Sequence, residues 1–118
     1  MGLSNKIIPK TVLLSVSDKT GIVPFARFLQ KQCVKIIATG GTAKILKQNG
    51  VKVRSVSSLT RFPEIFDGRV KSIHPNIAGG ILGKRDRDQQ EAKTNKILWI
   101  DMVVCNLYPF QKLSLIHI

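Results

Sequence analysis

Three apolar, β-prone runs separated by segments of helical character constrain the fold of this chain most strongly. They span Thr11–Val16, Val34–Thr39 and Ile100–Cys105. Unbroken runs of this kind are typical of strands that are buried on both faces, as in parallel sheets covered by helices. Between the first two runs, apolar residues recur at helical spacing to about Gln32, with Ser17 as a candidate N-cap. A helix in that position is long enough to connect two parallel strands.

The same alternation continues through the first half of the chain. We predict a turn at Gly40-Gly41, a helix that is capped by Thr42 and runs through Lys47, and a stop at Gly50 in the C′ position. Val51–Val56 is expected to form a third strand. The order β-α-β-α-β predicts an α/β fold, a three-layer parallel sheet between helices.

The second half is less regular. We expect a short helix around Pro63–Phe66, then a strand or extended segment at Ile77–Leu82. Asp86–Lys96 is predicted to be a polar helix, because its acidic residues come early and its lysines late, as the helix dipole favours.

Composition limits the class of protein. The 118 residues suit one small domain or part of a larger one, and 43% of them are hydrophobic. Neither a signal peptide nor an apolar run of membrane-spanning length is evident, so we expect a cytoplasmic protein without a membrane partner. Cys33 and Cys105 lack metal-ligand spacing and are expected to be reduced thiols, with Cys33 acting as a small buried hydrophobe.

The net charge of +12 attracts anions. Its cations are scattered along the chain and are not interleaved with aromatic residues, which make up only 6% of the sequence. This distribution argues against specific nucleic-acid binding and favours single phosphates bound in a pocket.

Polar residues follow the first two predicted strands, at Ser17-Asp18-Lys19 and at Thr39-Gly40-Gly41-Thr42. Ligands of open α/β sheets bind beyond the carboxyl ends of the strands, and free amides at helix N-termini attract anions. Neither stretch is a P-loop or a G-x-G-x-x-G motif, and hydroxyls at such places are also ordinary helix caps. Asn106 and Tyr108 follow the last predicted strand at the same edge.

The segment Arg69–Pro75 is the most cationic candidate for a ligand site. Arg69 and Lys71 alternate, so in extended backbone they project to the same side. Pro75 favours extended geometry at His74, which alone is also a common structural residue. Such a segment suits a phosphorylated metabolite.

Six motifs in order give the chain a family resemblance, over about Thr11 to Lys112. They are Ser15–Gly21, Thr39–Ala43, Phe62–Glu64, Gly68–Pro75, Gly79–Leu82 and Asn106–Phe110. Together they resemble the N-terminal IMP cyclohydrolase domain of the bifunctional purine biosynthesis proteins, which join this domain to an AICAR transformylase domain.

The resemblance implies a methylglyoxal-synthase-like fold and closure of a purine ring, in which formyl-aminoimidazole carboxamide ribonucleotide loses water to give IMP. It implies no metal or redox cofactor; 10-formyltetrahydrofolate would serve only the transformylase domain. It also implies a homodimer for a full-length protein in the cytosol. By resemblance, Lys71 and Tyr108 are catalytic. The residues implied to bind the nucleotide are Ser17, Asp18, Lys19, Thr39, Gly40, Gly41, Thr42, Arg69, Val70, Lys71, Ser72, Cys105 and Asn106.

The chain departs from the family pattern at several places. Ser72 stands for the usual Thr, Thr39 stands where Ser is also found, and Ala78 replaces a common His. Residues 1–112 are expected to be the N-terminal part of the domain and residues 113–118 an artificial tail. The family's later Asp-Ile-Gly-Gly segment and its catalytic Lys do not follow, so we expect an incomplete domain that is marginally stable and inactive by itself.

Three alternatives stay open at this stage. A methylglyoxal synthase shares the fold and takes a phosphorylated triose. A nucleotide-sensing domain like that of the carbamoyl phosphate synthetase large subunit would bind without turnover. A basic nucleic-acid module would lose binding steeply with salt.

Overall fold

The computed structural model of the chain describes residues 8–66 and 74–106. These residues form a parallel sheet of strands in the order β3-β2-β1-β4. The strands are β1 (Thr11–Ser15), β2 (Lys35–Ala38), β3 (Arg54–Ser55) and β4 (Met102–Cys105). Every pairing is parallel, and β1 lies between β2 and β4. The parallel α/β fold predicted from the sequence is therefore confirmed.

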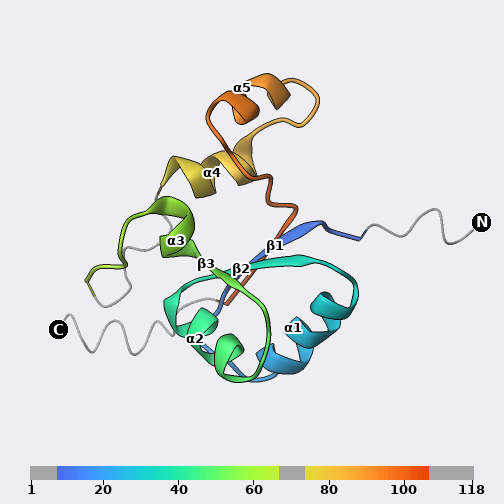
Figure 1. The fold of residues 1–118 in the computed structure, drawn as a ribbon, viewed down its shortest axis with the longest axis vertical. Coiled ribbons are helices and arrows are strands. Elements are labelled where there is room, and N and C mark those ends of the chain that lie inside the picture. The colour runs from blue at the N-terminus through green and yellow to red at the C-terminus, as the bar shows by residue number, and fades with distance from the viewer. Residues whose placement is uncertain (1–7, 67–73, 107–118) are drawn as a thin grey trace, which may run out of the picture.

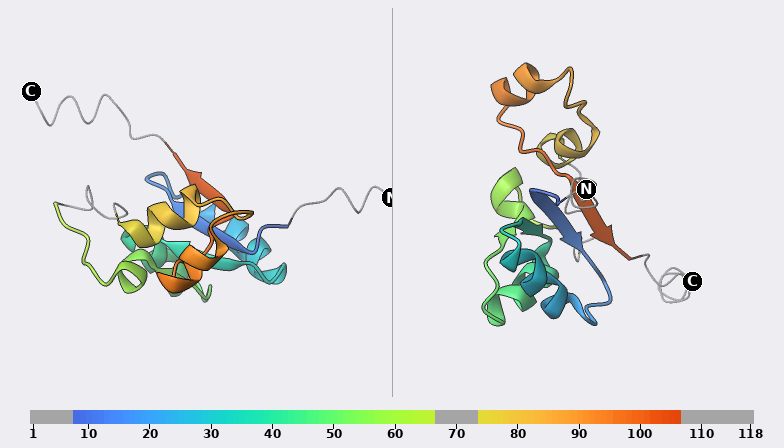
Figure 2. Two further views of the ribbon diagram at one scale, coloured as in Figure 1. Left: turned by 90° about the horizontal axis from the view of Figure 1, so that it is seen from above. Right: turned by 90° about the vertical axis from the view of Figure 1, so that its right-hand side faces the viewer.

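Helices cover both faces of this sheet (Figure 1). Helices α1 (Ile22–Lys31) and α2 (Gly40–Gln48) lie on one face, and α3 (Val56–Thr60) and α4 (Pro75–Leu82) lie on the other. Helix α5 (Gln89–Thr94) lies beyond α4, further from the sheet (Figure 1 and the right-hand view of Figure 2).

Alternate residues of β1 supply two separate cores. Val12 and Leu14 are fully buried against α1 and α2, whereas Leu13, which is 4% exposed, points to the α3/α4 face. This alternation follows from the pleat, which sends successive side chains to opposite faces. The first core is the larger. The buried residues of the second core are Leu13, Ile37, Val56, Ile77 and Ile100.

The strands differ from the predicted ones mainly at the edges of the sheet. Burial of β1 on both faces is confirmed, but β3 is reduced to two residues. The strand predicted at Ile100–Cys105 is confirmed over Met102–Cys105, but its predicted burial is wrong, because Val103 is 43% exposed. Within the described residues β4 pairs with β1 alone, so its other edge has no neighbouring strand (Figure 2, right).

Both N-terminal helices begin differently from the prediction. Helix α1 begins at Ile22 after Gly21, and Ser17 is not its cap. Helix α2 begins at Gly40 with Thr39 as N-cap, so Gly40 and Gly41 form its first turn instead of a preceding turn. Thr42 therefore lies inside the helix. The stop at Gly50 is confirmed, with φ of +76°.

The second half contains the larger errors. Residues 63–66 are not helical, and the short helix is α3, where the Ser55 side chain accepts from the Ser58 N–H. The predicted extended segment Ile77–Leu82 is helical in α4. Pro75 takes the first helical position, and Nδ1 of the extended His74 accepts from the Asn76 N–H at 3.1 Å. A proline with a capping side chain before it is a start signal for a helix.

Close backbone packing explains one of the two adjacent glycines of α4, Gly80. A Cβ on Gly80 would lie 2.3 Å from the carbonyl oxygen of Leu98, and the Gly80 carbonyl accepts from the Ile100 N–H at 3.0 Å. An apolar run that is interrupted by glycines shows neither the helical nor the strand period clearly. The sequence pattern therefore did not identify α4 as a helix. The predicted helix Asp86–Lys96 is confirmed in its central part as α5.

Cys33 is exposed, so its predicted role as a buried hydrophobe is wrong. It follows the last turn of α1 in the left-handed conformation, with φ of +62°. Its N–H bonds the carbonyl of Gln30, and the next N–H, of Val34, bonds that of Leu29, which together make a Schellman motif. Cys33 thus occupies the position that glycine usually takes.

A polar cluster ties the start of β4 to the start of β1. The Asp101 carboxylate accepts from the N–H groups of Lys10 at 2.9 Å and Thr11 at 3.0 Å. Nη2 of Arg85 lies 3.1 Å from the same carboxylate, and its guanidinium carbon lies 4.7 Å from the centroid of the Trp99 ring. Burial opposes ionisation of Asp101, but these donors outweigh it and hold the pKa below its ordinary value.

Candidate functional site at the carboxyl ends of the strands

The loop after β1 is held by Asn106, which follows β4. The Asn106 Oδ1 accepts from the Ser17 N–H at 2.7 Å, the Ser17 hydroxyl at 2.8 Å and the Asp18 N–H at 3.2 Å. Its Nδ2 donates to the Asp18 carbonyl at 3.1 Å. One amide thus fixes a loop that lies 88 residues away in sequence. The Ser17 hydroxyl therefore bonds Asn106, and the N-cap position of α1 is taken by Gly21.

Lys19 and Thr42 bring the end of β1 to the start of α2. Nζ of Lys19 donates to the carbonyl of Val16 at 2.8 Å and to that of Ser17 at 3.4 Å. The buried Thr42 hydroxyl donates to the same Val16 carbonyl at 3.2 Å and accepts from the Val16 N–H at 3.4 Å. The Thr42 side chain of α2 therefore bonds the backbone of Val16, which follows the end of β1. The bond of Lys19 to the same carbonyl holds its charge beside α2.

The N-terminus of α2 is polar and tightly packed. The hydroxyl of Thr39, which is only 2% exposed, lies 3.3 Å from that of Ser15. The Gly40 N–H donates to the carboxylate of Glu64. A Cβ on Gly41 would lie 3.3 Å from Cε of Lys19. A carboxylate therefore lies close to the first glycine, and the stem of an ammonium group lies close to the second.

Asp18 is ionised more readily than an ordinary aspartate. The Thr20 N–H donates to its carboxylate at 3.0 Å, and this bond, helped by the Lys19 charge, lowers the pKa of Asp18. Asp18 is exposed. Asp18 therefore presents a negative charge near the Lys19 ammonium group, so the carboxyl edge of the sheet carries charges of both signs.

The structure brings together most of the predicted site residues that it describes. Those at the carboxyl edge are Ser17, Asp18, Lys19, Thr39, Gly40, Gly41, Thr42 and Asn106, with Cys105 in register with Ser15. Arg69, Val70, Lys71, Ser72 and Tyr108 lie outside the described residues. His74 serves as the N-cap of α4, and Ala78 is exposed on the same helix.

Glu64 is the residue of this edge to which the sequence assigns no role. It belongs to the Phe62-Pro63-Glu64 motif, but nothing in that motif indicates that its carboxylate reaches the amide of Gly40. The signal was the Gly40-Gly41 pair itself: two glycines in a first helical turn indicate a close neighbour.

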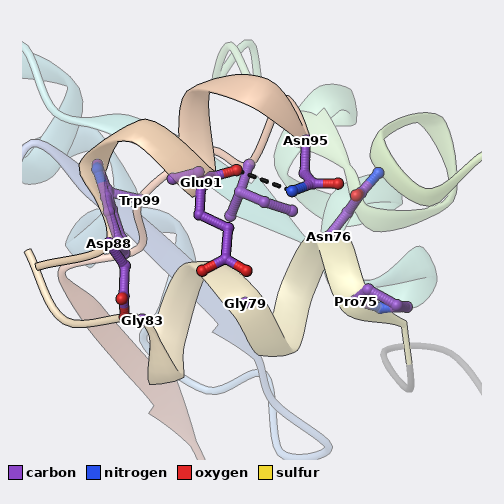
Figure 3. A pocket seen from close by; sticks show the side chains of 10 residues that line it. Pro75, Asn76, Gly79, Gly83, Asp88, Glu91, Asn95 and Trp99 are labelled. Atoms are coloured by element: carbon purple, nitrogen blue, oxygen red, sulfur yellow. Dashed lines mark hydrogen bonds between the residues drawn. The ribbon is translucent and has the colours of Figure 1, made fainter.

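A separate cavity of about 330 Å³ lies between α4 and α5 (Figure 3). Its wall includes Glu91, Asn76, Asn95 and the ring of Trp99, with Gly79 on the α4 side. None of the site residues predicted from the sequence lines it. The predicted site and this cavity are therefore two different features.

The described part of the chain holds no group of three or more His, Cys, Asp or Glu side chains placed to bind a metal ion. Among the described helices, none is long and apolar enough to cross a membrane.

Comparison with known proteins agrees with this fold. Curated proteins named bifunctional purine biosynthesis protein PurH, from Polynucleobacter necessarius subsp. necessarius (strain STIR1) and Bacillus mycoides (strain KBAB4), are 56% and 52% identical over 105 residues. These alignments cover 87% of the chain and 20% of each relative, so the chain spans about a fifth of their length. The resemblance noted in the sequence is confirmed.

A solved structure, described as the crystal structure of ForH, is similar to the chain with a TM-score of 0.73 and 34% sequence identity. That likeness covers 83% of this chain and 52% of the other. The profile of the MGS-like domain matches residues 21–114, which include the strands β2 to β4 and the helices α1 to α5. The chain therefore belongs to the MGS-like domain family.

Proposed function

We propose that the chain is part of an IMP cyclohydrolase and binds a purine nucleotide at the carboxyl edge of its sheet. The observation that carries this proposal is the identity of 52–56% to proteins named PurH, together with the convergence of Ser17–Lys19, Thr39–Thr42 and Asn106 at one edge. Lys19 supplies positive charge, the hydroxyls and Asn106 supply hydrogen bonds, and the N-terminus of α2 favours an anion.

The reaction suits a site that works mainly by positioning. Both reacting groups belong to one substrate, whose carboxamide nitrogen attacks its own formyl carbon before water leaves. Holding the reactive conformer then supplies much of the rate. Lys71 is proposed to stabilise the charge that develops on the formyl oxygen, and Tyr108 to relay a proton. Both roles rest on the family resemblance.

The remaining expectations belong to the same proposal. The site would need no metal or redox cofactor, the protein would act in the cytosol, and the longer protein would be a homodimer. A transformylase region, if the full protein has one, would use 10-formyltetrahydrofolate. Nucleic acid and membranes are not proposed as partners.

Binding of IMP to the chain tests the proposal directly. We expect saturable IMP binding by calorimetry, weakened about tenfold by Lys19→Ala, because a charged hydrogen-bond donor is lost. Lys52→Ala makes the same change of charge at an exposed residue after the C-terminus of α2 and should leave binding unchanged. Absence of IMP binding, or equal effects of the two variants, would contradict the proposed site.

Turnover assays separate the alternatives. Release of methylglyoxal from dihydroxyacetone phosphate would favour a synthase, and nucleotide binding by a full-length protein without ring closure would favour a sensing domain.

A further inference from the structure

The Glu64 carboxylate occupies the end of α2 that the proposed ligand would need. It is half-buried and accepts from the Gly40 N–H, one of the amides that an α-helix leaves without an internal partner. A carboxylate at this end is stabilised by the helix dipole and by the hydrogen bond, as a phosphate would be.

The space around Gly40 is shaped by this carboxylate. A Cβ at position 40 would lie 2.6 Å from Oε2 and 2.9 Å from Cδ of Glu64, distances that no real Cβ adopts. The neighbouring Gly41 faces Lys19 in the same way. A side chain at position 40 would therefore push the Glu64 carboxylate away from the Gly40 amide.

We propose that Glu64 is an internal anion that must leave Gly40 before the phosphate group of a ligand can bind there. The inference rests on the proposed function, which supplies the ligand class. Two anionic groups that compete for one N–H donor would lie close together, and at short distance their like charges repel each other. Glu64 thus lowers the apparent affinity of every anion that needs the Gly40 amide, and a nucleotide with further contacts has affinity in reserve.

Competition of this kind makes a quantitative prediction. The apparent affinity of every ligand that needs Gly40 is reduced by the same factor, the fraction of chains in which Glu64 has left. A ligand without a phosphate is not affected. Inorganic phosphate and IMP should therefore respond equally to a change at Glu64, and inosine should not respond.

The experiment compares binding of IMP, inorganic phosphate and inosine to the chain and to Glu64→Gln. The variant keeps the shape and an oxygen acceptor but loses the charge. We expect IMP and phosphate to bind about 3- to 30-fold more tightly, the range over which an anion at a helix N-terminus is stabilised. Inosine binding should stay the same. Glu91→Gln, an exposed residue of α5, makes the same change in net charge and should alter none of the three.

A second variant separates occupancy from charge. Glu64→Asp keeps the charge but is one methylene shorter, so its carboxylate no longer reaches Gly40, and it should also tighten phosphate binding. In the unmodified chain, adding phosphate should move the NMR signal of the Gly40 amide. In Glu64→Gln, that signal should begin at a different position.

The outcomes are distinct. Weaker binding of IMP by both Glu64 variants would show that Glu64 contacts the ligand favourably and would overturn the displacement. Unchanged binding would overturn it as well, while leaving the proposed function intact. If no form of the chain binds IMP, the proposed function fails and the displacement fails with it.

Discussion

The two faces of the sheet are built by different means. On the α1/α2 face, amphipathic helices cover a continuous apolar core that includes the fully buried Val12, Leu14, Ala26 and Leu46. On the α3/α4 face the core is smaller, and it is supplemented by a glycine contact at Gly80 and by the polar cluster of Asp101. The first face is stabilised by apolar burial. The second is stabilised by apolar burial together with a close backbone contact and polar interactions.

Two adjacent leucines of β1 provide the sharpest test of this difference. Leu14→Ala should lower the free energy of unfolding by about 4 kcal/mol, because the fully buried side chain leaves a cavity in the larger core. Leu13→Ala should cost about 2–3 kcal/mol, since the smaller core can collapse more easily. Urea denaturation measures both. A larger cost for Leu13→Ala would reverse the comparison.

The adjacent glycines of α4 test the importance of close packing on the second face. Gly80→Ala should cost about 2–3 kcal/mol, because its Cβ would meet the Leu98 carbonyl and force the backbone apart. Gly79→Ala meets only the Ile97 side chain, at 3.4 Å or more, and should stabilise the helix by about 0.5 kcal/mol. Thermal unfolding of the two variants gives the comparison, and equal shifts would disprove the close contact.

The C-termini of α1, α2 and α5 test whether the same helix-ending motif has the same stability in different parts of the molecule. Each ends in a Schellman motif, with Cys33, Gly50 and Lys96 in the left-handed position. Cys33→Gly and Lys96→Gly should each stabilise the chain by about 1 kcal/mol, whereas Gly50→Ala should destabilise it by about the same amount. Chemical denaturation measures the changes, and a destabilised Cys33→Gly would indicate that the thiol contributes contacts.

The polar cluster of the second face should respond to pH. Because the pKa of Asp101 is lowered in the folded chain, its contribution is present above the ordinary aspartate pKa and is lost as pH falls through the lowered value. Asp101→Asn should cost about 1 kcal/mol at pH 7, a small value because the Arg85 pair is partly open to water. The difference from the unmodified chain should vanish in acid. Unfolding curves from about pH 7 to pH 2 test this.

Sequence patterns predicted the first face well. Unbroken apolar runs identified β1 and β2, and the helical spacing of Ile22, Ala26 and Leu29 identified α1. These signals are local, because the spacing of apolar residues within a segment is enough to identify that segment as a helix or a strand. The carboxyl edge was predicted for the same reason, since it follows from where parallel strands end.

The second face could not be predicted in this way. Helix α4 is set by the backbone contact of Gly80 with Leu98, and the exposure of β4 is set by which strands lie beside it. The hydrogen bond from Gly40 to Glu64 likewise joins residues 24 positions apart. Tertiary contacts decide these features. Such contacts leave no regular spacing of residues in a single sequence from which they could be predicted.

The pairing of β1 has a consequence for the order in which the chain folds. Thr11 pairs with Lys35, 24 residues away, whereas Val12 pairs with Met102, 90 residues away. Closing the longer loop costs about 1 kcal/mol more entropy, so β1, α1 and β2 should assemble before β4 arrives. Val104→Ala should then speed unfolding and leave the refolding rate unchanged, which stopped-flow kinetics would reveal. Because Asn106 follows β4, the loop at Ser17 becomes ordered only in the last step of folding.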